Sequence, residues 1–287
     1  MIAKTLNIKG KLHTLDTPLV MGILNITPDS FYAESRKQTE AAVVGRIEAI
    51  LREGGNLIDV GGYSSRPDAA EVTASEEMNR LSFALRILRD RYPDVPVSVD
   101  TFRADIARCA VEEYGVALIN DISGGSLDAD MFSTIASLQV PYILMHMRGT
   151  PQTMQRHTDY ADLEGEIMQY FARKVEQLRL LGVNDLILDP GFGFSKTTDQ
   201  NYRLMSRLSE FALFELPLLV GISRKSMIYK FLGGTPADSL GGTTVLHTFA
   251  LLQGADILRV HDVRAAVEAV RLVGKLAASS AASSPLI

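Results

Sequence analysis

The chain has 287 residues, of which 46% are hydrophobic and 22% are charged, and its formal net charge is −5. This composition is typical of a globular protein, and the negative charge argues against a general nucleic-acid-binding surface. No segment approaches the roughly 18 uninterrupted apolar residues of a membrane span, and the N-terminal region lacks the apolar core of a secretion signal. The single cysteine, Cys109, cannot form an internal disulfide, which is typical of a cytoplasmic protein, and we expect it to fill space in the core.

Short apolar runs alternate with helical stretches along the first half of the chain. Residues 2–14 alternate loosely around Gly10, which predicts a short hairpin. Apolar strands are expected at residues 18–26, 57–62, 96–100 and 117–121. Helices are expected at residues 40–53 and 75–91, in the stretch that ends near Gly115, and at residues 128–138.

The second half continues this alternation. Strands are expected at residues 141–147, 186–189, 216–223 and 257–261. A helix at residues 162–181 carries an apolar stripe made of Leu163, Ile167, Phe171, Leu178 and Leu181. A last helix carries Val263, Val267, Val270 and Val273. We expect one domain over residues 1–276, followed by a disordered Ala- and Ser-rich tail at residues 277–287.

Eight strand-then-helix units without a block of consecutive strands predict the α/β class and an all-parallel sheet. Eight such units indicate closure into a (β/α)8 TIM barrel, here with a short N-terminal hairpin. The alternative is an open doubly wound sheet, which would place a Gly-rich dinucleotide turn after the first strand. Residues 25–29 do not form such a turn, so the barrel is favoured.

Polar side chains stand at the C-terminal ends of successive expected strands, where barrel enzymes place their sites. The clearest case is the run 186–194, in which a buried strand ends in Asp189 and is followed by Pro190 and two glycines that let a ligand approach the backbone. The whole set is Asn25, Asp100, Asn120, Asp121, His146, Asp189, Lys225, Arg259 and His261.

Two groups within this set point to a heterocyclic ligand. Asp100, Asn120 and Asp189 could line one pocket and bind the donor edge of an aminopyrimidinone ring. The alternative is that backbone groups or arginines satisfy each of them. Lys225 directly follows a buried strand and could reach a ring carbonyl or an anionic leaving group. The alternative for Lys225 is a solvated loop.

A third group predicts an anion site. Arg259 and His261 are two residues apart on one strand and therefore share a face, directly before the start of the last helix. The alternative is an internal Arg–Asp pair. His146 is expected to line the pocket or to be a satisfied core residue, and Asp59, inside the second strand of the barrel, is expected to be structural. No His, Cys and carboxylate cluster has zinc spacing.

Seven motifs together closely resemble the dihydropteroate synthase family of the folate pathway. They lie, in the family's order, at residues 25–31, 61–67, 98–101, 119–125, 188–194, 223–226 and 259–263. The resemblance extends from about residue 18 to residue 275. It implies the condensation of 6-hydroxymethyl-7,8-dihydropterin pyrophosphate with 4-aminobenzoate to 7,8-dihydropteroate and pyrophosphate, by a dissociative substitution.

The resemblance also implies roles for individual residues. The catalytic residues would be Asp100, Lys225, Asp29 and Arg66. The pterin would contact Asp100, Asn120, Met145, Asp189, Phe192, Gly221 and Lys225. Pyrophosphate would be bound by Asn25, Arg66, Arg259 and His261. The aminobenzoate would contact Phe31, Ser65, Pro67, Phe192, Lys225 and Ser226. Mg²⁺ would be the cofactor, held near Asn25.

The same resemblance implies a cytoplasmic homodimer with small-molecule substrates, inhibited competitively by sulfonamides, with no nucleic-acid or membrane partner.

The second loop departs from the family's Ser-Thr-Arg-Pro-Gly, because Ser65 replaces the threonine and Asp68 replaces the glycine. Two rivals remain. A pterin-dependent methyltransferase would share the pocket but lack the pyrophosphate clamp. A catalytically inactive pterin-binding subunit would have lost clamp residues.

Overall fold

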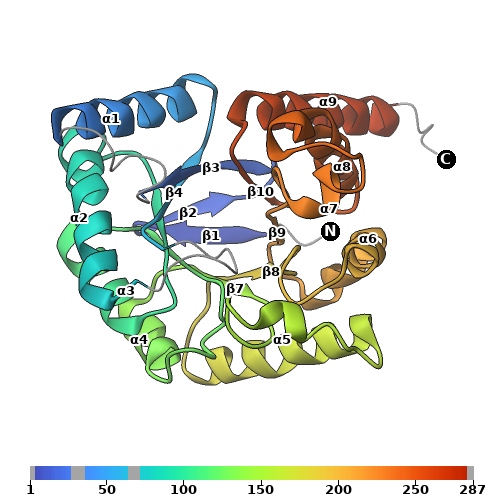
Figure 1. Ribbon diagram of the computed structural model, residues 1–287, viewed down its shortest axis with the longest axis horizontal. Helices are drawn as coiled ribbons and strands as arrows, with labels where there is room; N and C mark the ends of the chain where they lie inside the picture. The colour runs from blue at the N-terminus through green and yellow to red at the C-terminus, as the bar shows by residue number, and fades with distance from the viewer. Residues whose placement is uncertain (1–3, 27–35, 64–71, 283–287) are drawn as a thin grey trace.

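The expected strands form one parallel sheet that curves back on itself (Figure 1). The structure is a computed structural model, and it describes residues 4–26, 36–63 and 72–282. The strands of the sheet are β3 (Leu19–Asn25), β4 (Leu57–Gly61), β5 (Val97–Asp100), β6 (Leu118–Asp121), β7 (Tyr142–Met145), β8 (Leu186–Asp189), β9 (Leu219–Val220) and β10 (Ile257–Val260). Neighbours pair in the order β8-β7-β6-β5-β4-β3-β10-β9, and a parallel bridge between Leu188 and Leu218 joins the two ends. The predicted (β/α)8 barrel is confirmed.

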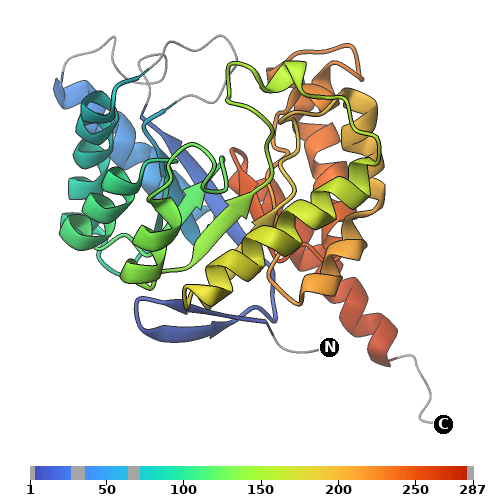
Figure 2. The ribbon, with the colours of Figure 1, turned by 90° about the horizontal axis from the view of Figure 1, so that it is seen from below.

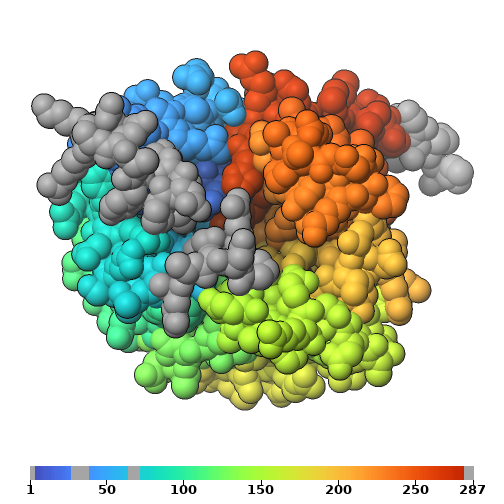
Figure 3. All heavy atoms as spheres, in the orientation of Figure 1, coloured from blue at the N-terminus to red at the C-terminus, as the bar shows by residue number. Residues whose placement is uncertain are grey.

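Helices surround the sheet on its outside (Figure 1). They are α1 (Arg36–Arg52), α2 (Ala74–Arg91), α3 (Ala104–Tyr114), α4 (Met131–Leu138), α5 (Leu163–Leu180), α6 (Thr198–Ser206), α7 (Ser226–Tyr229), α8 (Leu240–Leu252) and α9 (Val263–Ala282). Local signals set several ends: Thr73 and Asp162 cap α2 and α5, and Gly115 ends α3 with a φ of 67°. In the space-filling view the atoms of the chain from α4 to α8 form one continuous green, yellow and orange band along the lower and right-hand side (Figure 3).

The N-terminal hairpin closes one end of the barrel (Figure 2). Strands β1 (Thr5–Ile8) and β2 (Lys11–Thr14) pair antiparallel through a turn in which Lys9 and Gly10 both have positive φ. Leu6 and Ile8 are buried in one cluster with residues from the beginnings of the barrel strands, such as Leu57 and Ile257. This apolar plug fills the N-terminal end, so a ligand can enter only from the opposite end of the strands.

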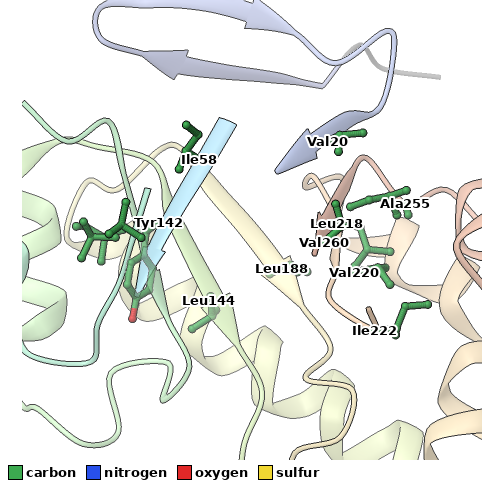
Figure 4. Packing of buried hydrophobic residues seen from close by; sticks show 14 of the residues in the cluster. Val20, Ile58, Tyr142, Leu144, Leu188, Leu218, Val220, Ile222, Ala255 and Val260 are labelled. Atoms are coloured by element: carbon green, nitrogen blue, oxygen red, sulfur yellow. The ribbon is translucent and has the colours of Figure 1, made fainter. Parts of the chain in front are cut away.

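A larger apolar cluster lies between the sheet and the helices. Figure 4 shows members of it, including Ile58, Tyr142 and Val260, which project from different strands. Each such side chain contributes about 1.5–3 kcal/mol when fully buried. The barrel is therefore a rigid frame for the residues at its C-terminal rim.

Three expectations about local structure need correction. Residues 277–282 belong to α9 rather than to a disordered tail, while residues 283–287 lie outside the described part. Leu181 follows α5 and is 48% exposed, so the buried stripe of α5 ends at Leu178. Cys109 is only partly buried. Among the described residues, no helix is long and apolar enough to span a membrane.

Candidate active site

Four of the barrel strands bring carboxylate, amide and guanidinium groups together. Arg259 of β10 donates from Nε to Asp59 Oδ2 of β4 at 2.6 Å and from Nη2 to Asp100 Oδ2 of β5 at 2.9 Å. Asn120 of β6 donates from Nδ2 to the same Asp59 Oδ2 at 3.1 Å. The structure therefore forms the internal Arg–Asp pair that the sequence left as an alternative for Arg259.

The charged groups of this cluster shift one another's pKa values. Burial raises the pKa of Asp100 to about 7; Arg259 opposes that shift, and Asp59 adds to it. Burial alone lowers the pKa of Arg259, but the attraction of Asp59 and Asp100 outweighs it, and the net shift is upward. Asp100 is thus a carboxylate that titrates near neutral pH, whereas Arg259 keeps its charge.

Asp189 lies at the end of β8 and is followed by a loop of residues 190–195. Its Oδ1 accepts the Gly191 N–H at 2.8 Å, and burial raises its pKa while Lys225 opposes the shift. Met145, the end residue of β7, is its partner in register. A Cβ on Gly221 would lie 3.9 Å from Asp189 Oδ2, so this glycine leaves the space beside the carboxylate open. The structure brings these three predicted residues into one wall of the barrel.

Lys225 lies against the same loop. Its Nζ donates to the Phe192 carbonyl at 2.5 Å and sits 4.6 Å from the centre of the Phe194 ring. Burial lowers the pKa of Lys225 to about 8, although Asp189 opposes the shift. Lys225 therefore remains an ammonium at neutral pH, held between a carbonyl and an aromatic face.

Phe192 does not have the position expected for it. Its ring is fully buried in the cluster between sheet and helices, and only its carbonyl reaches Lys225. Phe194 instead packs with Met145, Met147 and Met154, directly beside Lys225. The aromatic ring at this wall therefore belongs to Phe194, and the expectation of a Phe192 ring contact is corrected.

Lys196 is a buried residue that sequence reasoning missed. Its Nζ contacts the carbonyls of Gly191 and Phe194 at 3.0 Å each and His146 Nδ1 at 3.1 Å. Burial lowers its pKa to about 7 and holds the pKa of His146 well below its usual value. His146 is thus the satisfied core histidine that the sequence offered as one alternative. The only sequence signal for Lys196 is a lone lysine directly after a glycine-rich loop.

The second residue of the predicted anion site is His261, two positions after Arg259. His261 follows β10, and burial lowers its pKa to about 4, so its imidazole is neutral at pH 7. Arg224 pairs with Asp262 through two bonds of 2.9 and 2.6 Å. Ser226 begins α7, next to Lys225. Asp121 accepts the Tyr142 hydroxyl at 2.6 Å, and its charge adds to the upward shift of the Asp100 pKa.

Several predicted residues lie outside the described part of the chain, namely Asp29, Phe31, Ser65, Arg66 and Pro67. Asn25 is described at the end of β3, beside Gly61. Within residues 4–26, 36–63 and 72–282, no group of three or more His, Cys, Asp or Glu residues could hold a metal ion. Among the described residues at the open C-terminal end of the barrel, which we call the mouth, Asn25 offers an amide oxygen of the kind that Mg²⁺ accepts as a ligand.

Comparisons with known proteins agree with this architecture. A family profile described as pterin binding enzyme matches residues 21–261. The dihydropteroate synthases of Synechocystis and Escherichia coli are 42% and 41% identical to this chain, over 90% and 92% of it and 89% and 94% of their own lengths.

Solved structures give the same result. The Yersinia pestis dihydropteroate synthase with a sulfonamide drug complex superposes with a TM-score of 0.88 at 39% identity, covering 96% of this chain and 99% of the other. The Xanthomonas albilineans enzyme with 4-aminobenzoic acid gives a TM-score of 0.87 at 35% identity, with the same coverage. Fold, mouth and family profile together define a pterin-binding (β/α)8 barrel. The chain belongs to the dihydropteroate synthase family.

Proposed function

We propose that this chain condenses 6-hydroxymethyl-7,8-dihydropterin pyrophosphate with 4-aminobenzoate, giving 7,8-dihydropteroate and pyrophosphate. The observation that carries the proposal is the gathering of Asp100, Asn120, Asp189, Lys225 and Arg259 at one end of the barrel. About 40% identity to dihydropteroate synthases over most of the chain supports it.

The hydrogen-bonding groups of the site complement the amino-pyrimidinone edge of the pterin. Asn120 Oδ1 is buried and has no hydrogen-bond partner among the described residues, so it can accept from a ring N–H or amino group. Asp189 uses Oδ1 for the Gly191 N–H and can offer Oδ2. Lys225 Nζ has three donors, of which one goes to Phe192, and a ring carbonyl can take another. Donor and acceptor positions therefore fit an aminopyrimidinone.

The reaction needs charge stabilisation more than proton transfer. If the C–O bond to pyrophosphate breaks first, positive charge develops on the pterin methylene, and the ionised Asp100 can stabilise it. The amine of 4-aminobenzoate is a neutral nucleophile, so no strong general base is required. Phe194 and Ser226 supply an aromatic and a hydroxyl contact for the aminobenzoate beside Lys225. Arg66, Arg259 and His261 would bind the leaving pyrophosphate.

Mg²⁺ fits this mouth at Asn25. A Cβ on Gly61 would lie 3.1 Å from Asn25 Oδ1, so the glycine keeps that oxygen free of a neighbouring side chain. Amide oxygen is a suitable ligand, because Mg²⁺ usually keeps several waters and binds substrate phosphates. When bound, the ion would neutralise charge on the pyrophosphate.

A homodimer in the cytoplasm is part of the same proposal. Val245, Phe249 and Leu252 are 67%, 38% and 62% exposed on α8, and Leu272 and Leu276 are 67% and 62% exposed on α9. Their spacing places each set on one helix face. Exposed apolar side chains gathered in this way mark association surfaces, and a second copy of the chain is the proposed partner.

The test is product formation from dihydropterin pyrophosphate, 4-aminobenzoate and Mg²⁺, with Lys225→Ala beside the wild type. Losing one preorganised electrostatic contact lowers such rates by about 10²–10³-fold. Lys230→Ala, which removes an exposed lysine close in sequence, is the matched control and should keep full activity. Folded wild-type protein that binds pterin but forms no dihydropteroate would refute the proposal and favour the methyltransferase or the inactive subunit. Sulfonamides should inhibit competitively with 4-aminobenzoate.

A further inference from the structure

Asp59 joins a residue of the proposed pterin site, Asn120, to a residue of the proposed pyrophosphate site, Arg259, through one oxygen atom. Its Oδ2 accepts from Arg259 Nε at 2.6 Å and from Asn120 Nδ2 at 3.1 Å. Its Oδ1 has no partner among the described residues, and the side chain is fully buried in the middle of β4. Both contacts therefore depend on Oδ2, which lies below the rim and out of reach of solvent.

The contact with Asp59 decides which way the Asn120 amide faces. A carboxylate only accepts hydrogen bonds, so it favours the Nδ2 end of the amide and repels the Oδ1 end. Turning the amide over would bring two acceptors together in a buried place, which is costly. With Nδ2 held by Asp59, Oδ1 is the end left for a substrate, and it has no other described partner.

Asp59 Oδ2 also anchors the Arg259 guanidinium at its Nε atom. Nε is bound to Asp59, while Nη2 is bound to Asp100, whose side chain is partly exposed. A guanidinium anchored at Nε keeps its plane and leaves its outer nitrogens for partners at the rim. Asp59 thus orients both the Asn120 amide, which is proposed to bind the pterin ring, and the Arg259 guanidinium.

We infer that Asp59 is a positioning residue that sets substrate specificity, by holding Asn120 with its carbonyl oxygen toward the ligand and by anchoring Arg259. The inference rests on the proposed function and deepens it. It predicts that the site requires a hydrogen-bond donor where the pterin carries its 2-amino group. A ring with an oxo group at that position would place two acceptors against each other.

The experiment compares two ligands on two variants of the full chain. The ligands are 6-hydroxymethylpterin and 6-hydroxymethyllumazine, which has an oxo group in place of the 2-amino group, and calorimetry measures both dissociation constants. In Asp59→Asn the new amide can donate, so Asn120 is free to turn over. The matched control is Asp121→Asn, which removes an equally buried carboxylate that bonds Tyr142 instead.

Asp59→Asn should weaken pterin binding by about 2- to 10-fold, the value of one hydrogen bond between neutral groups, because the Asn120 carbonyl is no longer held toward the ring. The preference for pterin over lumazine should fall by about tenfold or more, whereas Asp121→Asn should keep the wild-type preference. An unchanged preference in folded Asp59→Asn would overturn the inference while leaving the proposed function intact. Wild-type protein that binds no pterin would overturn both.

A measurement on the wild type covers the case in which Asp59→Asn does not fold. The side-chain amide protons of Asn120, assigned by their absence in Asn120→Leu, should exchange slowly with solvent because Asp59 holds them in a buried bond. Exchange as fast as that of an exposed asparagine would overturn the inference.

Discussion

Replacing the buried Lys196 with Met should change the pH dependence of stability. Methionine has a similar length but no charge and no donors. In the wild type the Lys196 ammonium is surrounded by two carbonyls and the His146 ring, and burial lowers its pKa from 10.5 to about 7. The unfolded chain therefore binds this proton more tightly than the folded chain does.

The size and sign of the effect follow from proton linkage. Between the folded and the unfolded pKa, the unfolded chain carries one more proton at this site, so raising the pH stabilises the fold by about 1.4 kcal/mol per unit. Below the folded pKa both states are protonated and the dependence ends. From about pH 7.5 to about pH 9.5, the stability of the wild type relative to Lys196→Met should rise by about 3 kcal/mol.

Urea unfolding at the two pH values measures this difference. Comparing the two proteins cancels titrations that they share. Lys275→Met, which removes an exposed lysine of α9, is the matched control and should show a difference that does not depend on pH. A pH-independent difference for Lys196→Met as well would refute the reasoning, because it would mean that the buried ammonium keeps its ordinary pKa.

Three further predictions concern activity and the rim. The value of kcat/KM for the pterin substrate should rise toward pH 7 as Asp100 ionises and fall above about pH 8 as Lys225 loses its proton. Lys225→Arg should move the fall at alkaline pH to a higher pH. A profile that does not change with pH would contradict the roles given to Asp100 and Lys225. Gly193→Ala, at φ 81° and with its Cβ 3.2 Å from Lys225 Cδ, should raise the pterin KM and cost about 1–2 kcal/mol of stability. Gly10→Ala has the same backbone strain, at φ 76°, but no atom within 4 Å, so a raised KM there would count against the contact argument. Asp68→Gly should lower the KM for the anionic 4-aminobenzoate alone by removing a like charge, and an unchanged KM would show that Asp68 does not act on it.

The sequence predicted the barrel and most of the rim because both depend on short-range patterns. Apolar runs mark the strands, and parallel strands bring their C-terminal ends to one side, so Asp100, Asn120 and Asp189 could be grouped without coordinates. The interactions of Asp59 could not be found in this way. Its partner Arg259 is 200 residues away, and only closure of the barrel brings the two together.

The two phenylalanines of the 190–195 loop show a second feature that the sequence could not predict. Sequence spacing cannot tell whether Phe192 or Phe194 faces the mouth, because backbone angles in the loop decide it. Gly191, Gly193 and Ser195 all have positive φ, at 71°, 81° and 51°. This alternation turns the Phe192 ring into the outer core and wraps the loop carbonyls around Lys196. A lysine that looks like a surface residue in the sequence is buried for that reason.

The charges around the mouth support the proposal that a further cation takes part in pyrophosphate binding. Asp59, Asp100 and Asp189 contribute three negative charges when ionised, and Lys196, Lys225 and Arg259 contribute three positive charges. Such a balanced interior suits a neutral pterin ring, whose hydrogen bonds then need not compete with an uncompensated charge. This interior has no surplus positive charge to offset the several negative charges of a pyrophosphate. The additional positive charge has to come from the rim, where Arg66 and Mg²⁺ beside Asn25 are proposed to act.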